Sequence, residues 1–208
     1  MAFIEKIEYK LLKESLKNKY TYILWLGFIA SLFAFNITLA NPIFIFLGFI
    51  FSLIIVIDIK HFLILDTLQI ILFVIANILL NQTGLWQLGY MGAAIGLILF
   101  GSIYFVYEKL LDKQALGFGD VKLFVTSGLF VGAFAFSYFL WILTALSFVV
   151  IIARLFIKDK NKLIPYGPII VISIWICLIF EKQLFTIFYN FINNLSLIHI
   201  SEPTRRTP

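Results

Sequence analysis

The chain is dominated by long apolar segments, many of them long enough to cross a lipid bilayer. Apolar residues make up 62% of its 208 residues and charged residues only 13%, whereas soluble domains are roughly half apolar and a quarter charged. This composition excludes a soluble globular domain, a soluble nucleic-acid-binding protein, a disordered chain and a disulfide scaffold. We therefore expect an all-α, polytopic transmembrane helix bundle that has the lipid bilayer, and no nucleic acid, as a partner.

About seven spans are expected. They cover residues 20–40, 43–58, 62–80, 88–107, 119–132, 134–156 and 165–180, of which the second and fifth are short for a bilayer. Residues 1–19 alternate charged and apolar side chains, which predicts an amphipathic helix on the membrane surface, and residues 20–42 hold the first span and an outer turn. Glycine pairs at 92 and 96, and at 128 and 132, predict close helix packing.

The C-terminal end is interpreted separately from the bundle. Residues 195–208 read LSLIHISEPTRRTP and resemble an in-frame translation of a transposase sequencing adaptor, so we interpret them as non-native and assign them no function. Residues 181–194 are then a C-terminal segment that begins a further, truncated span.

Basic residues concentrate in alternate connections between the predicted spans. Thirteen of them fall on one side of the membrane: Lys6, Lys10, Lys13, Lys17, Lys19, Lys60, Lys109, Lys113, Lys122, Arg154, Lys158, Lys160 and Lys162. The opposite connections, near residues 41–42, 81–87 and 133, contain no lysine or arginine, and Lys182 is the exception to the pattern. By the positive-inside rule the N-terminus is cytoplasmic, and the net charge of +5 reflects topology.

Three acidic residues lie close to the predicted cytoplasmic boundary. Asp58 ends the second span, Asp66 lies inside the start of the third, and Asp120 opens the fifth. Asp58 as a helix terminator and Asp120 as an N-cap are the simpler interpretations, and the same carboxylates would suit a cation transporter. One cysteine, Cys177, and two distant histidines predict neither a disulfide nor a metal centre.

Local sequence around these aspartates favours an enzyme. GFGDVKL at residues 117–123 resembles the GxGDxKL signature of the bacterial type IV prepilin peptidases, which are membrane aspartyl proteases of the GxGD class. DIKHFLILD at residues 58–66 resembles the second acidic motif of that family, and IPYGP at residues 164–168 resembles its IPFGP element. The three motifs occur in the family's order, and residues 43–180 are identified as a prepilin-peptidase-like catalytic bundle.

The resemblance implies roles for individual residues. Asp58 and Asp120 match the catalytic aspartates, while the supporting or substrate-binding positions are Asp66, Gly117, Gly119, Lys122, Pro165 and Gly167. Gly117 and Gly119 would let an extended substrate backbone approach Asp120. Lys122 would pair with an acidic group or a lipid headgroup, and we favour a plain topology determinant as its role. Leu65 stands where the family often has proline, which affects the expected turn and leaves the two aspartates unchanged.

The implied activity is cleavage of the basic leader from type IV prepilins, or from type II secretion pseudopilins, at the inner face of the bacterial cytoplasmic membrane. Because the CxxC motifs of long family members are missing, we expect a peptidase-only short form with no cofactor, no metal and no methyl donor. A presenilin-like protease is disfavoured, because Ile57 stands where its motif has tyrosine. A carboxylate-based transporter or an inactive membrane scaffold is the alternative outside this class.

Overall fold

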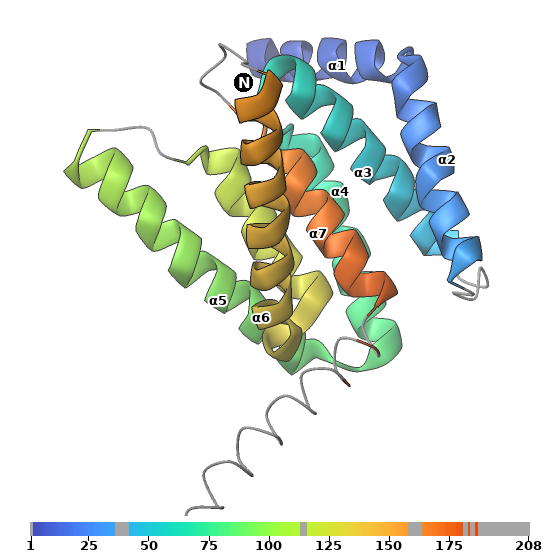
Figure 1. The fold of residues 1–208 in the computed structure, drawn as a ribbon, viewed down its shortest axis with the longest axis vertical. Helices are drawn as coiled ribbons and strands as arrows, with labels where there is room; N and C mark the ends of the chain where they lie inside the picture. Colours follow the sequence, from blue (N-terminus) through green and yellow to red (C-terminus); the bar gives the residue numbers. More distant parts are fainter. Residues whose placement is uncertain are drawn as a thin grey trace, which may run out of the picture.

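The computed structural model describes residues 2–35, 42–112, 116–157 and 164–180, together with Gln183 and Thr186. Every element in these ranges is helical, as the sequence predicts. In chain order they are α1 (Ala2–Leu16), α2 (Lys19–Ala34), α3 (Pro42–His61), α4 (Asp66–Thr83), α5 (Trp86–Phe105), a π-helical turn η1 (Val106–Leu110), α6 (Phe118–Ile157) and α7 (Gly167–Ile179) (Figure 1). Three parts of the chain lie outside the described residues: residues 36–41, which include the end of the predicted first span, most of the 181–194 segment, and the 195–208 tail.

Each of the seven predicted spans has a helical counterpart. Helices α3, α4, α5 and α6 are long and apolar enough to cross a membrane, while α2 and α7 are shorter apolar helices. The 40 residues of α6 are two helical segments that meet at Gly132, where φ is 76° and ψ is 166°. Figure 1 shows the second segment returning toward the end of the bundle from which the first one starts, so α6 accounts for the predicted spans 119–132 and 134–156.

The boundary between the second and third spans differs from the prediction. Helix α3 does not stop at Asp58 but continues through His61, and its 20 residues make it a full-length span and not a short one. It ends because Phe62 adopts a left-handed conformation with φ 53°, so residues 62–65 form a connection and α4 begins only at Asp66. The prediction ended the span where charged residues interrupt the apolar run, but lysine and histidine are compatible with a helix.

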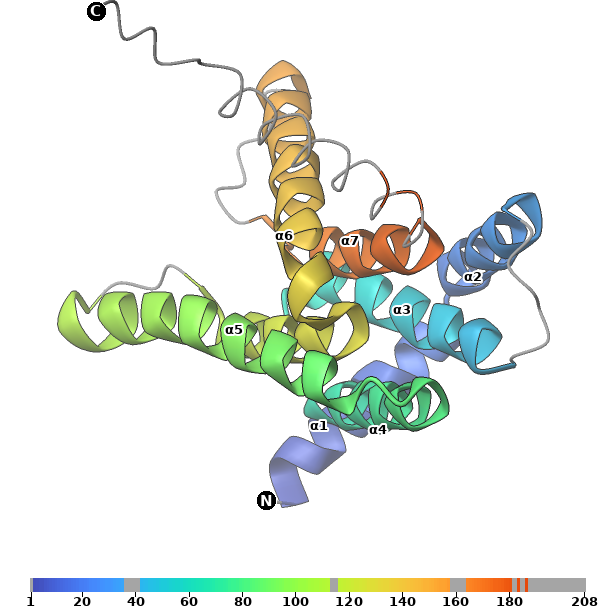
Figure 2. The same ribbon diagram turned by 90° about the horizontal axis from the view of Figure 1, so that it is seen from below.

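Helix α3 lies at the centre of the bundle. Eleven of its residues are buried, and Leu47, Phe51, Ile54 and Ile57 are at most 1% exposed. It contacts α1, α2, α4 and α7, and Figure 2 shows α2 and α7 on one side of it and α5 leaning away toward α6. Because α3 is held on several sides, side chains near its end have restricted positions.

Helices α5 and α6 pack backbone against backbone. A Cβ atom built on Gly128 would lie 2.3 Å from the carbonyl carbon and oxygen of Gly92, and one on Gly96 would lie 2.7 Å from the carbonyl oxygen of Phe124. Small residues spaced by four along each helix permit this approach. The predicted role of the two glycine pairs in packing is therefore confirmed.

Candidate active site

The three aspartates singled out in the sequence lie at one end of the bundle. Asp58 is in the last turn of α3, Asp66 is the first residue of α4, and Asp120 is in the first turn of α6. In Figure 1 these helix ends, and the start of α7, occupy the upper part of the molecule below α1. Residues distant in sequence therefore meet in one region.

The carboxyl group of Asp58 is buried against the start of α7. Asp58 is 4% exposed, and the backbone N–H of Gly167 donates to its Oδ2 at 2.8 Å. A Cβ atom at position 167 would lie 2.8 Å from the same oxygen, so only glycine fits there without a shift. Gly167 is the first residue of α7, and the positive end of the helix dipole favours a carboxylate at this point.

The short turn before α6 holds Asp120 in a similar way. The Asp120 backbone N–H donates to the carbonyl of Gly117 at 3.0 Å, and the Gly117 backbone lies beside the Asp120 carboxyl group. A Cβ atom on Gly117 would lie 3.0 Å from Oδ2 of Asp120. The Asp120 residue as a whole is half-buried, whereas Asp58 is buried.

The two carboxyl groups are close enough to interact electrostatically, although α3 and α6 contribute them from positions 62 residues apart. The Asp58 carboxyl group lies at the N-terminus of α7, beside the Gly167 backbone, and the Asp120 carboxyl group lies at the N-terminus of α6, beside the Gly117 backbone. Neighbouring carboxyl groups in a partly buried site share a proton, which leaves one acid and one base available together. This pairing is what acid–base hydrolysis of a peptide bond requires.

Asp66 is in a different environment from the other two aspartates. Its Oδ1 accepts a hydrogen bond from Nζ of Lys122 at 2.7 Å, and the Asp66 side chain is 60% exposed. The Lys122 ammonium also lies 4.9 Å from the centre of the Phe118 ring. Of the two partners expected for Lys122, an acidic group is the one observed, and the pair links the start of α4 to the start of α6.

Gly119 lets the turn before α6 pack against the connection that follows α3. A Cβ atom on Gly119 would lie 3.3 Å from Cβ of Ile64. Gly117 and Gly119 thus make room for the Asp120 carboxyl group and for Ile64 of the same chain. The approach of a substrate backbone to these glycines stays a prediction.

Pro165 lies in the segment that leads into α7. Tyr166 is the N-cap residue, and its carbonyl accepts from the N–H groups of Ile169 and Ile170 at 3.1 Å. The Tyr166 hydroxyl lies 3.1 Å from Oγ of Ser147 on the second segment of α6. These contacts fix where α7 begins, and therefore where the Gly167 N–H meets Asp58.

Two polar residues near the site were not singled out in the sequence. Glu8 of α1 accepts hydrogen bonds from the backbone N–H of Asp66, at 3.1 Å, and from the hydroxyl of Thr67. Gln69 donates from Nε2 to the carbonyl of Gly119 at 2.8 Å. A polar amide within an apolar span is costly unless it is bonded, and that was the available signal for Gln69.

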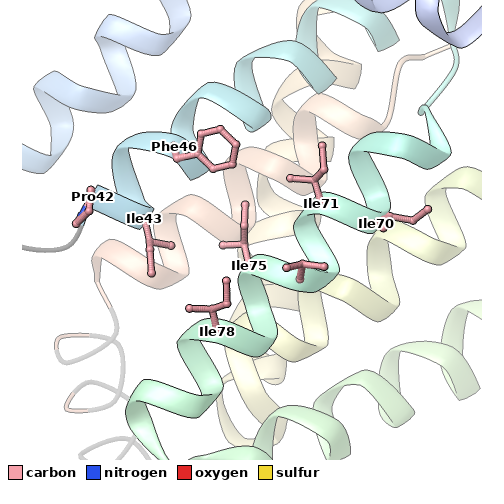
Figure 3. A pocket seen from close by; sticks show the side chains of 8 residues that line it. Pro42, Ile43, Phe46, Ile70, Ile71, Ile75 and Ile78 are labelled. Atoms are coloured by element: carbon pink, nitrogen blue, oxygen red, sulfur yellow. The ribbon is translucent and has the colours of Figure 1, made fainter.

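An apolar groove elsewhere on the molecule is lined by none of these site residues. It lies between the first part of α3 and the outward side of α4, and Figure 3 shows it lined by Pro42, Phe46 and several isoleucines. Phe46 precedes Asp58 by twelve residues, which is about 18 Å along a helix. Within the described ranges, no group of three or more His, Cys, Asp or Glu residues could hold a metal ion.

Comparison with known proteins finds curated relatives that match part of this chain. Curated relatives named prepilin leader peptidase/N-methyltransferase include one from Aeromonas salmonicida, 27% identical over 96 residues, which are 45% of this chain and 33% of the relative. Those from Stutzerimonas stutzeri and Pseudomonas aeruginosa are 25% and 28% identical over 133 residues, or 62% of this chain and 46% of each relative. The chain thus matches less than half the length of these relatives, and no solved structure matches it.

The family model described as the type IV leader peptidase family matches residues 45–157, more than half of the chain. The matched region runs from the first part of α3 to the end of α6 and includes Asp58, Asp66 and Asp120. The chain belongs to the type IV leader peptidase family.

Proposed function

We propose that this protein is a membrane aspartic endopeptidase that removes the basic leader from type IV prepilins or type II secretion pseudopilins. The observation that carries the proposal is the convergence of the Asp58 and Asp120 carboxyl groups, within electrostatic range of each other, at one end of an apolar helix bundle. Membership of the leader peptidase family gives the reaction class, and the names of the curated relatives give the substrate class.

The chemistry follows from two adjacent carboxyl groups with one shared proton. The ionised carboxylate takes a proton from a water molecule, whose oxygen attacks the scissile carbonyl carbon, while the other carboxyl group protonates the carbonyl oxygen. Collapse of the tetrahedral intermediate breaks the C–N bond. One hydroxyl of the intermediate returns a proton to the second carboxylate, and the departing nitrogen receives the proton that the first carboxylate took from water. Asp58 and Asp120 are the proposed pair; the hydrogen bond from Gly167 orients Asp58, and the turn at Gly117 orients Asp120.

The position of the site suits a substrate that is basic on one side of the cut and apolar on the other. Asp58 lies near the end of α3 and Asp120 near the start of α6, on the side of the bundle where α1 lies with its lysines. We propose that this side is cytoplasmic, in a bacterial inner membrane, because the positive-inside rule assigns it so. A leader in the cytoplasm would then reach the aspartates while the apolar helix stays in the bilayer.

Methyl transfer, the second activity in the names of the relatives, is not part of the proposal. The chain contains a single cysteine, Cys177, so it has no CxxC motif among its 208 residues. The residues proposed to act in peptide hydrolysis lie in the region matched by the family model or in the Gly167 turn that contacts it. We therefore propose peptidase activity alone.

The direct test is replacement of each proposed catalytic carboxyl group by an amide. The Asp58→Asn and Asp120→Asn substitutions keep side-chain size but leave no ionisable group, so leader cleavage of a co-expressed prepilin is expected to be lost in both. Cleavage is measured by the mobility shift of the pilin and by sequencing of its new N-terminus.

Asp112→Asn is a matched control for this test. Asp112 is exposed near the same end of the bundle and has φ 48°, a conformation that asparagine also adopts. Cleavage should be unchanged in this variant. Retained cleavage in either Asp58→Asn or Asp120→Asn would refute the proposed function.

A further inference from the structure

Gln69 is a buried amide in the first turn of α4. It is 6% exposed, and its Nε2 donates to the carbonyl of Gly119 at 2.8 Å, while its Oε1 has no hydrogen-bond partner among the described residues. The reversed amide would bring two acceptors together, so the Gly119 carbonyl selects this orientation. Since an unpaired buried acceptor costs free energy, stability alone does not account for this residue.

The contact restrains the peptide group that joins Gly119 to Asp120. The N–H of this peptide donates to the carbonyl of Gly117 at 3.0 Å, and its carbonyl accepts from Gln69 at 2.8 Å. Because a peptide group is planar, holding both of its polar atoms fixes the plane. The direction in which the Asp120 side chain leaves the backbone is thereby set.

Two further contacts join the same two segments but hold them less firmly. Ile64 packs against Gly119 without any directional bond. The pair between Asp66 and Lys122 is largely exposed, and exposed ion pairs contribute little to stability. The Gln69 bond is directional and its donor side chain is buried, so it is the contact best able to fix the orientation of the Gly119–Asp120 peptide.

We propose that Gln69 is a positioning residue for the peptidase reaction: its side-chain N–H holds the Gly119 carbonyl and thereby aims the Asp120 carboxyl group at Asp58. This inference rests on the proposed function. Gln69 acts through the backbone and does not contact the substrate, so its loss changes the chemical step and leaves substrate binding in place.

The test is the kinetics of the purified full chain on a prepilin, in detergent, with Gln69→Met and Gln69→Glu. Methionine keeps the length and removes the amide, while an ionised glutamate keeps an acceptor and removes the donor. For both variants we expect kcat to fall by roughly 10- to 100-fold with KM within about two-fold of the starting protein, because small misplacements of a reacting group have effects of this size.

Gln87→Met is the matched control, since Gln87 is exposed at the start of α5, near the other end of the bundle. Its kcat and KM should not change, and thermal unfolding of every variant is measured in the same detergent. If Gln69→Met prevents folding, Gln69→Glu carries the test, because it keeps a polar side chain of the same length.

Each other result overturns the inference in a distinct way. An unchanged kcat in Gln69→Met means that the Gly119 contact is dispensable, and a rise in KM alone means that Gln69 contacts the substrate. Activity kept by Gln69→Glu but lost by Gln69→Met means that the amide N–H is not required and assigns the role to a side-chain oxygen at this position. If Asp58→Asn and Asp120→Asn abolish cleavage in the same assay, the proposed function stands whichever result Gln69 gives.

Discussion

At the scale of single residues, the site depends on glycines that touch aspartates. The Gly167 N–H bonds to Asp58 at 2.8 Å, and a methyl group on Gly167 would lie 2.8 Å from the same carboxyl oxygen. Gly167→Ala must therefore displace α7 or rotate the carboxyl group. We expect about 1–3 kcal/mol of destabilisation from overpacking, together with a large loss of leader cleavage, measured by unfolding in detergent and by the cleavage assay.

Gly27→Ala is the control for this substitution. Gly27 lies within α2, and a Cβ atom there would have no neighbour within 4 Å. Alanine in a helix is favoured over glycine by up to about 1 kcal/mol, so this variant should be as stable as the starting protein or more so. Full activity in Gly167→Ala would mean that the Asp58 carboxyl group tolerates a different position.

At the scale of elements, the start of α4 receives its cap from α1. The N-cap residue of α4, Leu65, makes no side-chain hydrogen bond, and Glu8 supplies the acceptor for the Asp66 N–H. Unsatisfied N–H groups at a helix start are costly. Glu8→Ala should therefore lower the free energy of unfolding by about 1 kcal/mol, as loss of an N-cap does, with Glu8→Gln in between, as measured by chemical denaturation in detergent.

Glu5→Ala serves as the comparison for the Glu8 variants. Glu5 is exposed on the same helix, one turn before Glu8, and removing its charge should leave stability nearly unchanged. An equal loss in Glu5→Ala and Glu8→Ala would show that the effect comes from α1 as a whole, and the capping contact would then have no separate contribution.

At the scale of the whole molecule, the fold could be predicted because it depends on properties that local sequence carries. The length of each apolar segment predicts a helix, and glycines spaced by four predict the close contact of α5 with α6, which the structure contains. The end of α3 was misplaced because polarity changes at Asp58 while the helix runs on to His61.

The site was less predictable than the fold. The distribution of basic residues predicted that Asp58, Asp66 and Asp120 lie on one side of the membrane. Only the packing of the helices shows that Asp58 is 4% exposed while Asp66 is in a surface ion pair. The bonds from Gly167 to Asp58 and from Gln69 to Gly119 join residues 109 and 50 positions apart. No local pattern encodes such pairs, since they depend on how whole helices dock.

The arrangement of the bundle in the membrane leads to the last prediction. Glu14 of α1 lies 3.8 Å from Lys60, so the N-terminal helix and the end of α3 are on one side, and the positive-inside rule predicts that this side is cytoplasmic. In a Cys177→Ser background, which has no other cysteine, a membrane-impermeant maleimide added to spheroplasts should label Gln87→Cys and spare Glu5→Cys. Both positions are exposed, so lysis should make both reactive. Labelling of Glu5→Cys before lysis would reverse the orientation and put the aspartates on the side where a cytoplasmic leader cannot reach them.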